Sequence, residues 1–125
     1  MTDLIKVLSI DDEEQMFLIM KMTVSPLGFE FDYASNKEDI PTLIKEKGYD
    51  IAVIDYLMPG KNGLEVVDDI RLALGNEFPI VFLTSKELDE DETKRLVKLN
   101  LDYMRKPFLP QILSAKLKEL VSKKS

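Results

Sequence analysis

The chain has 125 residues, of which 45% are hydrophobic and 32% are charged, and its formal net charge at pH 7 is −6. This length predicts one packed domain, and the apolar share excludes an intrinsically disordered chain. The longest segment without a charged side chain, residues 107–115, is far shorter than the roughly 18 residues of a membrane span. We therefore expect one soluble domain over residues 1–125 and no contact with a membrane.

Apolar segments of two kinds alternate along the first half of the chain. Residues 4–10 and 29–34 have the β-branched or alternating pattern of strands. Residues 14–27 and 40–47 have apolar positions at helical spacing. The first half therefore predicts two strands, each followed by a helix.

The second half repeats this alternation. Strands are predicted at residues 51–54, 80–83 and, more weakly, 103–105, and helices at residues 64–74, 88–99 and 111–122. Alternating elements with continuous apolar strands indicate an α/β fold whose parallel sheet is covered on both faces. In doubly wound sheets of this kind, ligands bind at the carboxyl ends of the strands.

The residue types that are missing restrict the chemistry. The chain contains no cysteine and no histidine, which excludes disulfides, thiolate nucleophiles, imidazole bases and Cys- or His-ligated zinc. The negative net charge argues against direct binding of nucleic acid. Residues 1–6 lack the basic start and apolar centre of an export signal, so we expect a cytoplasmic protein.

Polar side chains follow four of the five predicted strands. In chain order they are Asp11, Asp12 and Glu13, then Asp55, then Thr84 and Ser85, and finally Lys106. The first acidic pair alone could simply cap the following helix. If the first and third strands are neighbours, however, their carboxylates repel one another and require a compensating cation.

Mg²⁺ suits such a cluster because it takes oxygen ligands from one or two carboxylates and a phosphate oxygen. With no histidine or cysteine available, the remaining nucleophile is a carboxylate, and aspartate is a known phosphoryl acceptor. The metal, Lys106 and the Thr84 hydroxyl could each neutralise one oxygen of a transferring phosphoryl group. The residues therefore favour a phosphoaspartate site.

Four segments resemble the receiver domain of bacterial two-component response regulators. They are IDDE at 10–13, VIDYLMPGKNGL at 53–64, LTS at 83–85 and YMRKPF at 103–108, each after its own strand. The likeness extends over nearly the whole chain. It implies a flavodoxin-like, doubly wound sheet of five parallel strands in the order 2-1-3-4-5, with five helices.

The resemblance implies that Asp55 accepts the phosphoryl group and that Mg²⁺ is the cofactor. Asp12 and Asp55 would be direct metal ligands, Asp11 a ligand acting through water, and the backbone carbonyl of Leu57 a further ligand. The chain departs from many relatives in having an apolar side chain at Leu57 and a basic one at Lys86. Both positions flank the expected phosphate, so they bear on the rate of autodephosphorylation.

Three further residues resemble the switch machinery of the family. Thr84 resembles the hydroxyl that turns toward the phosphoryl group, and Lys106 resembles the ion-pairing lysine. Tyr103 resembles the aromatic residue that moves inward when Thr84 moves. An ordinary, partly buried tyrosine with a hydrated hydroxyl is the alternative for Tyr103. The Lys106–Pro107 bond resembles one that is often a cis peptide in the family.

The resemblance implies a phosphorylation-controlled switch that receives its phosphoryl group from the phosphohistidine of a histidine kinase or a histidine phosphotransfer protein. Such a switch turns over no external substrate, so we do not predict an enzyme in that sense. A Mg²⁺-dependent phosphohydrolase acting through an aspartyl phosphate is the alternative, but its two aspartates usually lie two positions apart rather than adjacent. A flavodoxin would need a Ser/Thr/Gly-rich phosphate loop where this chain is acidic.

Two surfaces are predicted to meet partners. The output surface is expected on the fourth helix, fifth strand and fifth helix, with a phosphorylation-dependent homodimer as a possible assembly. The kinase or phosphotransfer protein is expected to dock on the first helix through Phe17, Leu18 and Met22. These three fall outside the predicted core stripe of that helix, which consists of Met16, Ile19, Met20, Thr23 and Leu27. The alternative is a rotated stripe that places one or two of the three in the core.

Overall fold

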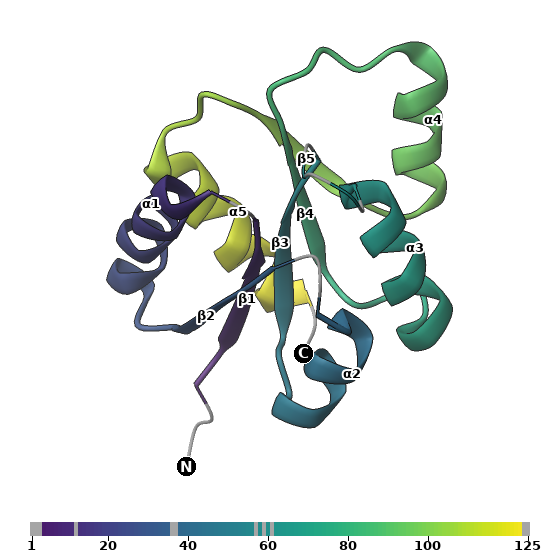
Figure 1. The fold of residues 1–125 in the computed structure, drawn as a ribbon. Coiled ribbons are helices and arrows are strands. Elements are labelled where there is room, and N and C mark those ends of the chain that lie inside the picture. Colours follow the sequence, from purple (N-terminus) through teal and green to yellow (C-terminus); the bar gives the residue numbers. More distant parts are fainter. Residues whose placement is uncertain are drawn as a thin grey trace.

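The computed structural model describes residues 4–11, 13–35, 38–56, 58, 60 and 62–123. Their centre is a five-stranded parallel sheet in the order β2-β1-β3-β4-β5 (Figure 1). The strands are β1 (Lys6–Ile10), β2 (Glu30–Ala34), β3 (Ile51–Asp55), β4 (Ile80–Thr84) and β5 (Asp102–Arg105). The predicted doubly wound fold and its strand order are confirmed.

Helices cover both faces of the sheet (Figure 1). One face carries α1 (Glu14–Val24) and α5 (Pro110–Lys123), and the other carries α2 (Ile40–Lys47), α3 (Gly63–Leu74) and α4 (Glu90–Lys98). Within the described ranges, every helix is too short or too polar to cross a lipid bilayer.

The core consists of two apolar layers, one on each face of the sheet. Successive strand residues point to opposite faces, so that Val7 packs in the layer under α1 and α5 while Leu8 packs in the layer under α2 and α3. β3 and β4 are buried at every position because they lie between both layers. This double burial explains their continuous apolar sequences.

Two helix ends differ from the prediction by more than one residue. The first helix ends three residues early, and a 3₁₀ turn, η1 (Ser25–Leu27), follows it. Pro26 lies in the first turn of η1 and has no amide proton with which to continue the helical ladder. The fourth helix begins two residues later than predicted, because Asp89 and Glu92 form a reciprocal capping box that fixes its start.

The predicted core stripe of α1 needs a small correction. Met16, Met20 and Thr23 are buried as expected, but Ile19 and Leu27 are only partly buried and Val24 is buried instead. The rotated stripe is wrong, because all three residues outside the predicted stripe are exposed, namely Phe17, Leu18 and Met22.

Candidate functional site

Four polar side chains converge at the carboxyl edge of the sheet. Asp11 directly follows β1, Asp55 and Thr84 end β3 and β4, and Lys106 directly follows β5. The exposed fractions of Asp11, Asp55 and Thr84 are 2%, 3% and 0%. The parallel register aligns the ends of β1, β3 and β4, so two carboxylates and a hydroxyl share one buried edge.

Lys106 provides the positive charge at this edge. Its Nζ lies 3.0 Å from Oδ1 of Asp55 and 4.0 Å from Oδ2 of Asp11. The backbone places it there, because the Lys106 amide donates to the carbonyl of Thr84 at 2.8 Å and so extends the sheet ladder by one residue. One ammonium group thus faces two buried carboxylates, which leaves their combined charge incompletely neutralised.

The pKa values of both carboxyls reflect this imbalance. Burial and the neighbouring Asp55 raise the pKa of Asp11 from 3.8 to about 6, against the opposing effect of the Glu13 amide and of Lys106. Burial also raises the pKa of Asp55, and Lys106 opposes that shift. The site therefore holds its negative charge at neutral pH against an electrostatic cost.

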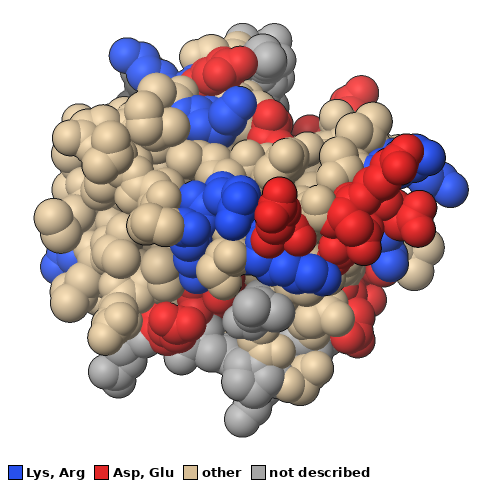
Figure 2. Space-filling model, turned by 90° about the horizontal axis from the view of Figure 1, so that it is seen from above, with Lys and Arg blue, Asp and Glu red and all other residues tan. Residues whose placement is uncertain are grey.

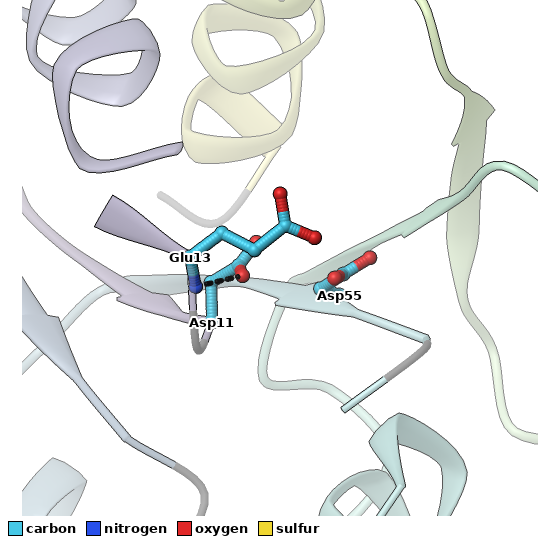
Figure 3. Close-up of side chains that lie close together, drawn as sticks. All are labelled: Asp11, Glu13 and Asp55. Atoms are coloured by element: carbon cyan, nitrogen blue, oxygen red, sulfur yellow. Dashed lines mark hydrogen bonds between the residues drawn. The ribbon is translucent and has the colours of Figure 1, made fainter. Parts of the chain in front are cut away.

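A third carboxylate completes the cluster. Carboxylate oxygens of Asp11, Glu13 and Asp55 lie within 4.8 Å of one another (Figure 3). Oδ1 of Asp11 accepts from the Glu13 amide at 2.9 Å, whereas its buried Oδ2 has no hydrogen-bond partner. An unpartnered buried oxygen facing other carboxylates fits a hard divalent cation such as Mg²⁺, which prefers oxygen ligands.

The structure brings Asp11 and Asp55 of the predicted metal site together and places the Glu13 carboxylate beside them. The sequence places Glu13 at this edge as the third acid in a row after β1, but the resemblance to the receiver family assigns it no role. Asp12 and the carbonyl of Leu57 lie outside the described residues.

The start of α3 packs closely against the backbone of Asp55 at the end of β3. A Cβ at Gly63 would collide with the backbone carbonyl of Asp55, so a residue without a side chain is required at this close approach. The Gly63 amide donates to the carbonyl of Tyr56 at 2.9 Å. Asn62 caps the helix in a reciprocal box with Glu65, which fixes the helix start against the end of β3.

The sequence matches the family model described as response regulator receiver domain over residues 7–118. The chain belongs to this family. Receiver domains are phosphorylation-dependent signalling switches, and the match covers every polar residue found at the carboxyl edge.

Solved structures of other receiver domains have the same fold. The receiver domain protein from Clostridium thermocellum is 26% identical, with a TM-score of 0.84 and coverage of 97% of each chain. The receiver domain of Francisella response regulator 1452 is 26% identical, with a TM-score of 0.83 and coverage of 96% of this chain and 98% of that chain. Chemotaxis protein CheY4 from Vibrio cholerae is 23% identical, with a TM-score of 0.82 and coverage of 94% of this chain and 99% of that chain.

In this receiver domain, the residues expected to form the switch lie in two different environments. Thr84 is fully buried, and its hydroxyl bonds to the backbone of Lys86, accepting from the amide at 3.0 Å. Tyr103 is 44% exposed on β5. The Lys106–Pro107 peptide is cis.

An apolar surface adjoins the carboxyl edge on the side of α1 and α5. Seen from above, this side is largely free of charged side chains, which gather instead at the centre and over α4 (Figure 2). Leu18 and Met22 of α1 are 61% and 66% exposed, and Leu109 and Ile112 at the start of α5 are 64% and 56% exposed. A groove of about 570 Å³ lies between these elements, lined by Met22, Pro26, Leu109, Pro110, Gln111 and Ser114.

Proposed function

We propose that residues 1–125 act as one cytoplasmic receiver domain whose signalling state changes when Asp55 is phosphorylated. The observation that carries this proposal is the buried Asp55 carboxylate, which lies 3.0 Å from the Lys106 ammonium and close to the carboxylates of Asp11 and Glu13. A nucleophile, a fixed cation and the ligands of a second cation thus meet at one edge.

Phosphoryl transfer would proceed from the phosphohistidine of a histidine kinase or a histidine phosphotransfer protein. A carboxylate oxygen of Asp55 attacks phosphorus, an O–P bond forms as the P–N bond breaks, and the departing imidazole takes up a proton. Lys106 stays beside the transferred group and balances part of its charge. Hydrolysis of the acyl phosphate by water returns the carboxylate and releases inorganic phosphate, without turnover of an external substrate.

The acidic cluster would hold the cofactor. The proposed Mg²⁺ ligands are Asp12 and Asp55 directly, Asp11 through water, and the backbone carbonyl of Leu57. When bound, Mg²⁺ supplies positive charge that stabilises the oxygens of the transferring phosphoryl group. Oδ2 of Asp11 supports this assignment, because this buried carboxylate oxygen has no hydrogen bond and lies 4.0 Å from the Lys106 ammonium, which Asp11 shares with Asp55.

The proposed output begins at Thr84. Its hydroxyl would turn from the Lys86 amide toward the phosphoryl oxygens, and Tyr103, now partly exposed, would move inward. The surface of α4, β5 and α5 would change with these two residues. A homodimer formed through this surface after phosphorylation is the proposed assembly.

The proposed docking surface for the histidine-bearing partner consists of Phe17, Leu18 and Met22 on α1. These side chains are exposed on the helix that starts directly after the acidic cluster. The side of a helical bundle fits this surface, because it could pack on apolar residues while presenting a phosphohistidine to Asp55. Phe17 also contacts the rings of Phe31 and Tyr33 at 5.7 Å between centroids, so it has a packing role as well.

The test is phosphorylation by acetyl phosphate with Mg²⁺, followed by mass spectrometry of the intact chain. Wild-type protein should gain one phosphoryl group, and Asp55→Asn should gain none. Asp91→Asn, which removes an exposed carboxylate from α4, is the control for loss of charge and should behave as wild type. Undiminished phosphorylation of Asp55→Asn would refute the assignment.

A further inference from the structure

A cluster of three side chains lies directly beside Asp55 at the carboxyl edge of the sheet. Oε2 of Glu92 accepts from the Tyr56 hydroxyl at 2.9 Å and from the Lys86 ammonium at 2.8 Å. The same ammonium lies 5.6 Å from the centroid of the Tyr56 ring. We call Tyr56, Lys86 and Glu92 the Glu92 hub, and it joins the residue after β3, the β4–α4 loop and the first turn of α4.

Two members of the hub, Tyr56 and Glu92, are also held by backbone hydrogen bonds. The Tyr56 amide donates to the carbonyl of Leu83 at 2.7 Å, and Oε1 of Glu92 accepts from the Asp89 amide at 3.1 Å. The Tyr56 ring packs against Phe82 of β4, with 5.2 Å between centroids. The hub is thus a defined arrangement rather than a chance contact of long side chains.

Through Lys86 the hub reaches Thr84. The Lys86 amide donates to Oγ1 of Thr84 at 3.0 Å, and the Thr84 hydroxyl donates back to the Lys86 carbonyl at 3.3 Å. Both hydrogen bonds described for this hydroxyl therefore lead to Lys86, whose side chain is anchored on Glu92. If Thr84 turns toward Asp55, its bond to the Lys86 amide must break.

The charges of the hub persist over a wide pH range. Lys86, the Asp89 amide and Tyr56 together lower the pKa of Glu92 to about 2, while burial and Glu92 raise the pKa of Tyr56. At neutral pH the carboxylate is therefore ionised and the phenol is protonated, as the two hydrogen bonds require.

We propose that Glu92 is a positioning residue that holds the β4–α4 loop, and with it Thr84, in the unphosphorylated conformation. This inference rests on the proposed function, because it assigns a regulator to the Asp55 site. The hub is a restraint that phosphorylation must overcome. Weakening it should increase the population of the conformation that accepts a phosphoryl group, and the apparent affinity for a phosphoryl analogue should rise by the same factor.

Two variants and a control test this inference. Glu92→Gln removes the charge but keeps the size, and Tyr56→Phe removes one hydroxyl but keeps the ring on Phe82. Glu90→Gln makes the same charge change in the same helical turn, where Glu90 pairs only weakly with Lys94, at 3.4 Å and with both side chains exposed.

Two measurements are made on the 125-residue chain of each variant. The first is hydrogen exchange of the Lys86 amide by NMR in the unphosphorylated protein, and the second is the dissociation constant of beryllofluoride in the presence of Mg²⁺. Both hub variants should exchange this amide about 2–10-fold faster and bind beryllofluoride about 2–10-fold more tightly, the factor expected from one net hydrogen bond. Glu90→Gln should match wild type in both.

Tighter binding separates positioning from mere structural support, since damage to the site would weaken binding. Wild-type exchange or affinity in either hub variant, weaker binding, or an equal gain in Glu90→Gln would overturn the inference. Failure of the proposed function would appear differently, as wild-type protein that binds no beryllofluoride and accepts no phosphoryl group. In that case the exchange of the Lys86 amide alone would support or overturn the restraint by the hub.

Discussion

Replacement of Asp11 by Asn should stabilise the metal-free protein at neutral pH. In the folded state the pKa of Asp11 rises from 3.8 to about 6, mainly through burial. A raised pKa stabilises the folded state below pH 4, and this contribution is lost as the pH rises through 6. The difference between these two pKa values corresponds to about 3 kcal/mol. Because the nearby Asp55 carboxyl titrates together with Asp11, we expect Asp11→Asn to raise the free energy of unfolding by about 1–3 kcal/mol.

The substitution changes little else. Asparagine keeps the oxygen that accepts from the Glu13 amide, and its NH₂ group replaces an oxygen that has no hydrogen-bond partner. Urea unfolding in EDTA at pH 7.5 and at pH 4 measures the effect, with an unchanged m-value as the check for two-state behaviour. The gain should shrink toward zero at pH 4, where the Asp11 carboxyl of the folded protein is protonated and therefore as neutral as asparagine. A less stable variant at pH 7.5, or an equal difference at both pH values, would refute the reasoning.

Three other predictions concern stability and partners. Arg71→Met should lower the free energy of unfolding by about 3–5 kcal/mol, because the buried guanidinium donates to four backbone carbonyls. The control Arg95→Met breaks an exposed ion pair and should lower it by less than about 1 kcal/mol. Denaturant titration of both variants measures the two losses, and similar losses would contradict the prediction. Leu18→Lys with Met22→Lys should slow transfer from a partner's phosphohistidine but not from acetyl phosphate, and Leu72→Lys on α3, 91% exposed, is the control; equal slowing with both donors would contradict the docking surface. Fully phosphorylated protein should sediment as a dimer, and persistent monomers in ultracentrifugation would exclude the proposed homodimer.

The order and type of the elements were predictable because burial on one or both faces imposes a periodicity on the sequence. The helix ends were less predictable, since they depend on local backbone bonding. Pro26 stops α1 inside a segment whose apolar spacing continues to Leu27, and the side chains of Asp89 and Glu92 select the start of α4. Periodicity carries no information on either choice.

The carboxyl edge was predictable for a different reason. Polar residues at strand ends stand out against apolar strands, so the sequence alone predicts that Asp55 and Lys106, which lie 3.0 Å apart in the structure, meet at one site. The Glu92 hub was not predictable, because its contacts depend on the rotamers of side chains that are up to 36 positions apart in the sequence. Arg71 was missed because an arginine on a helix is usually solvated, whereas this one is 7% exposed.

The contacts of Arg71 and of the Glu92 hub hold opposite ends of α4. Arg71 donates to the carbonyls of Leu99 and Asn100 just beyond the carboxyl end of the helix, and burial lowers the pKa of its guanidinium. At the amino end, the hub depends on the pair of Glu92 with Lys86, whose side chain is 48% exposed, so this pair contributes less than the buried contacts of Arg71. Because the weaker restraint lies next to Asp55, a charge added there should displace the first turn of α4 while its last turn stays fixed.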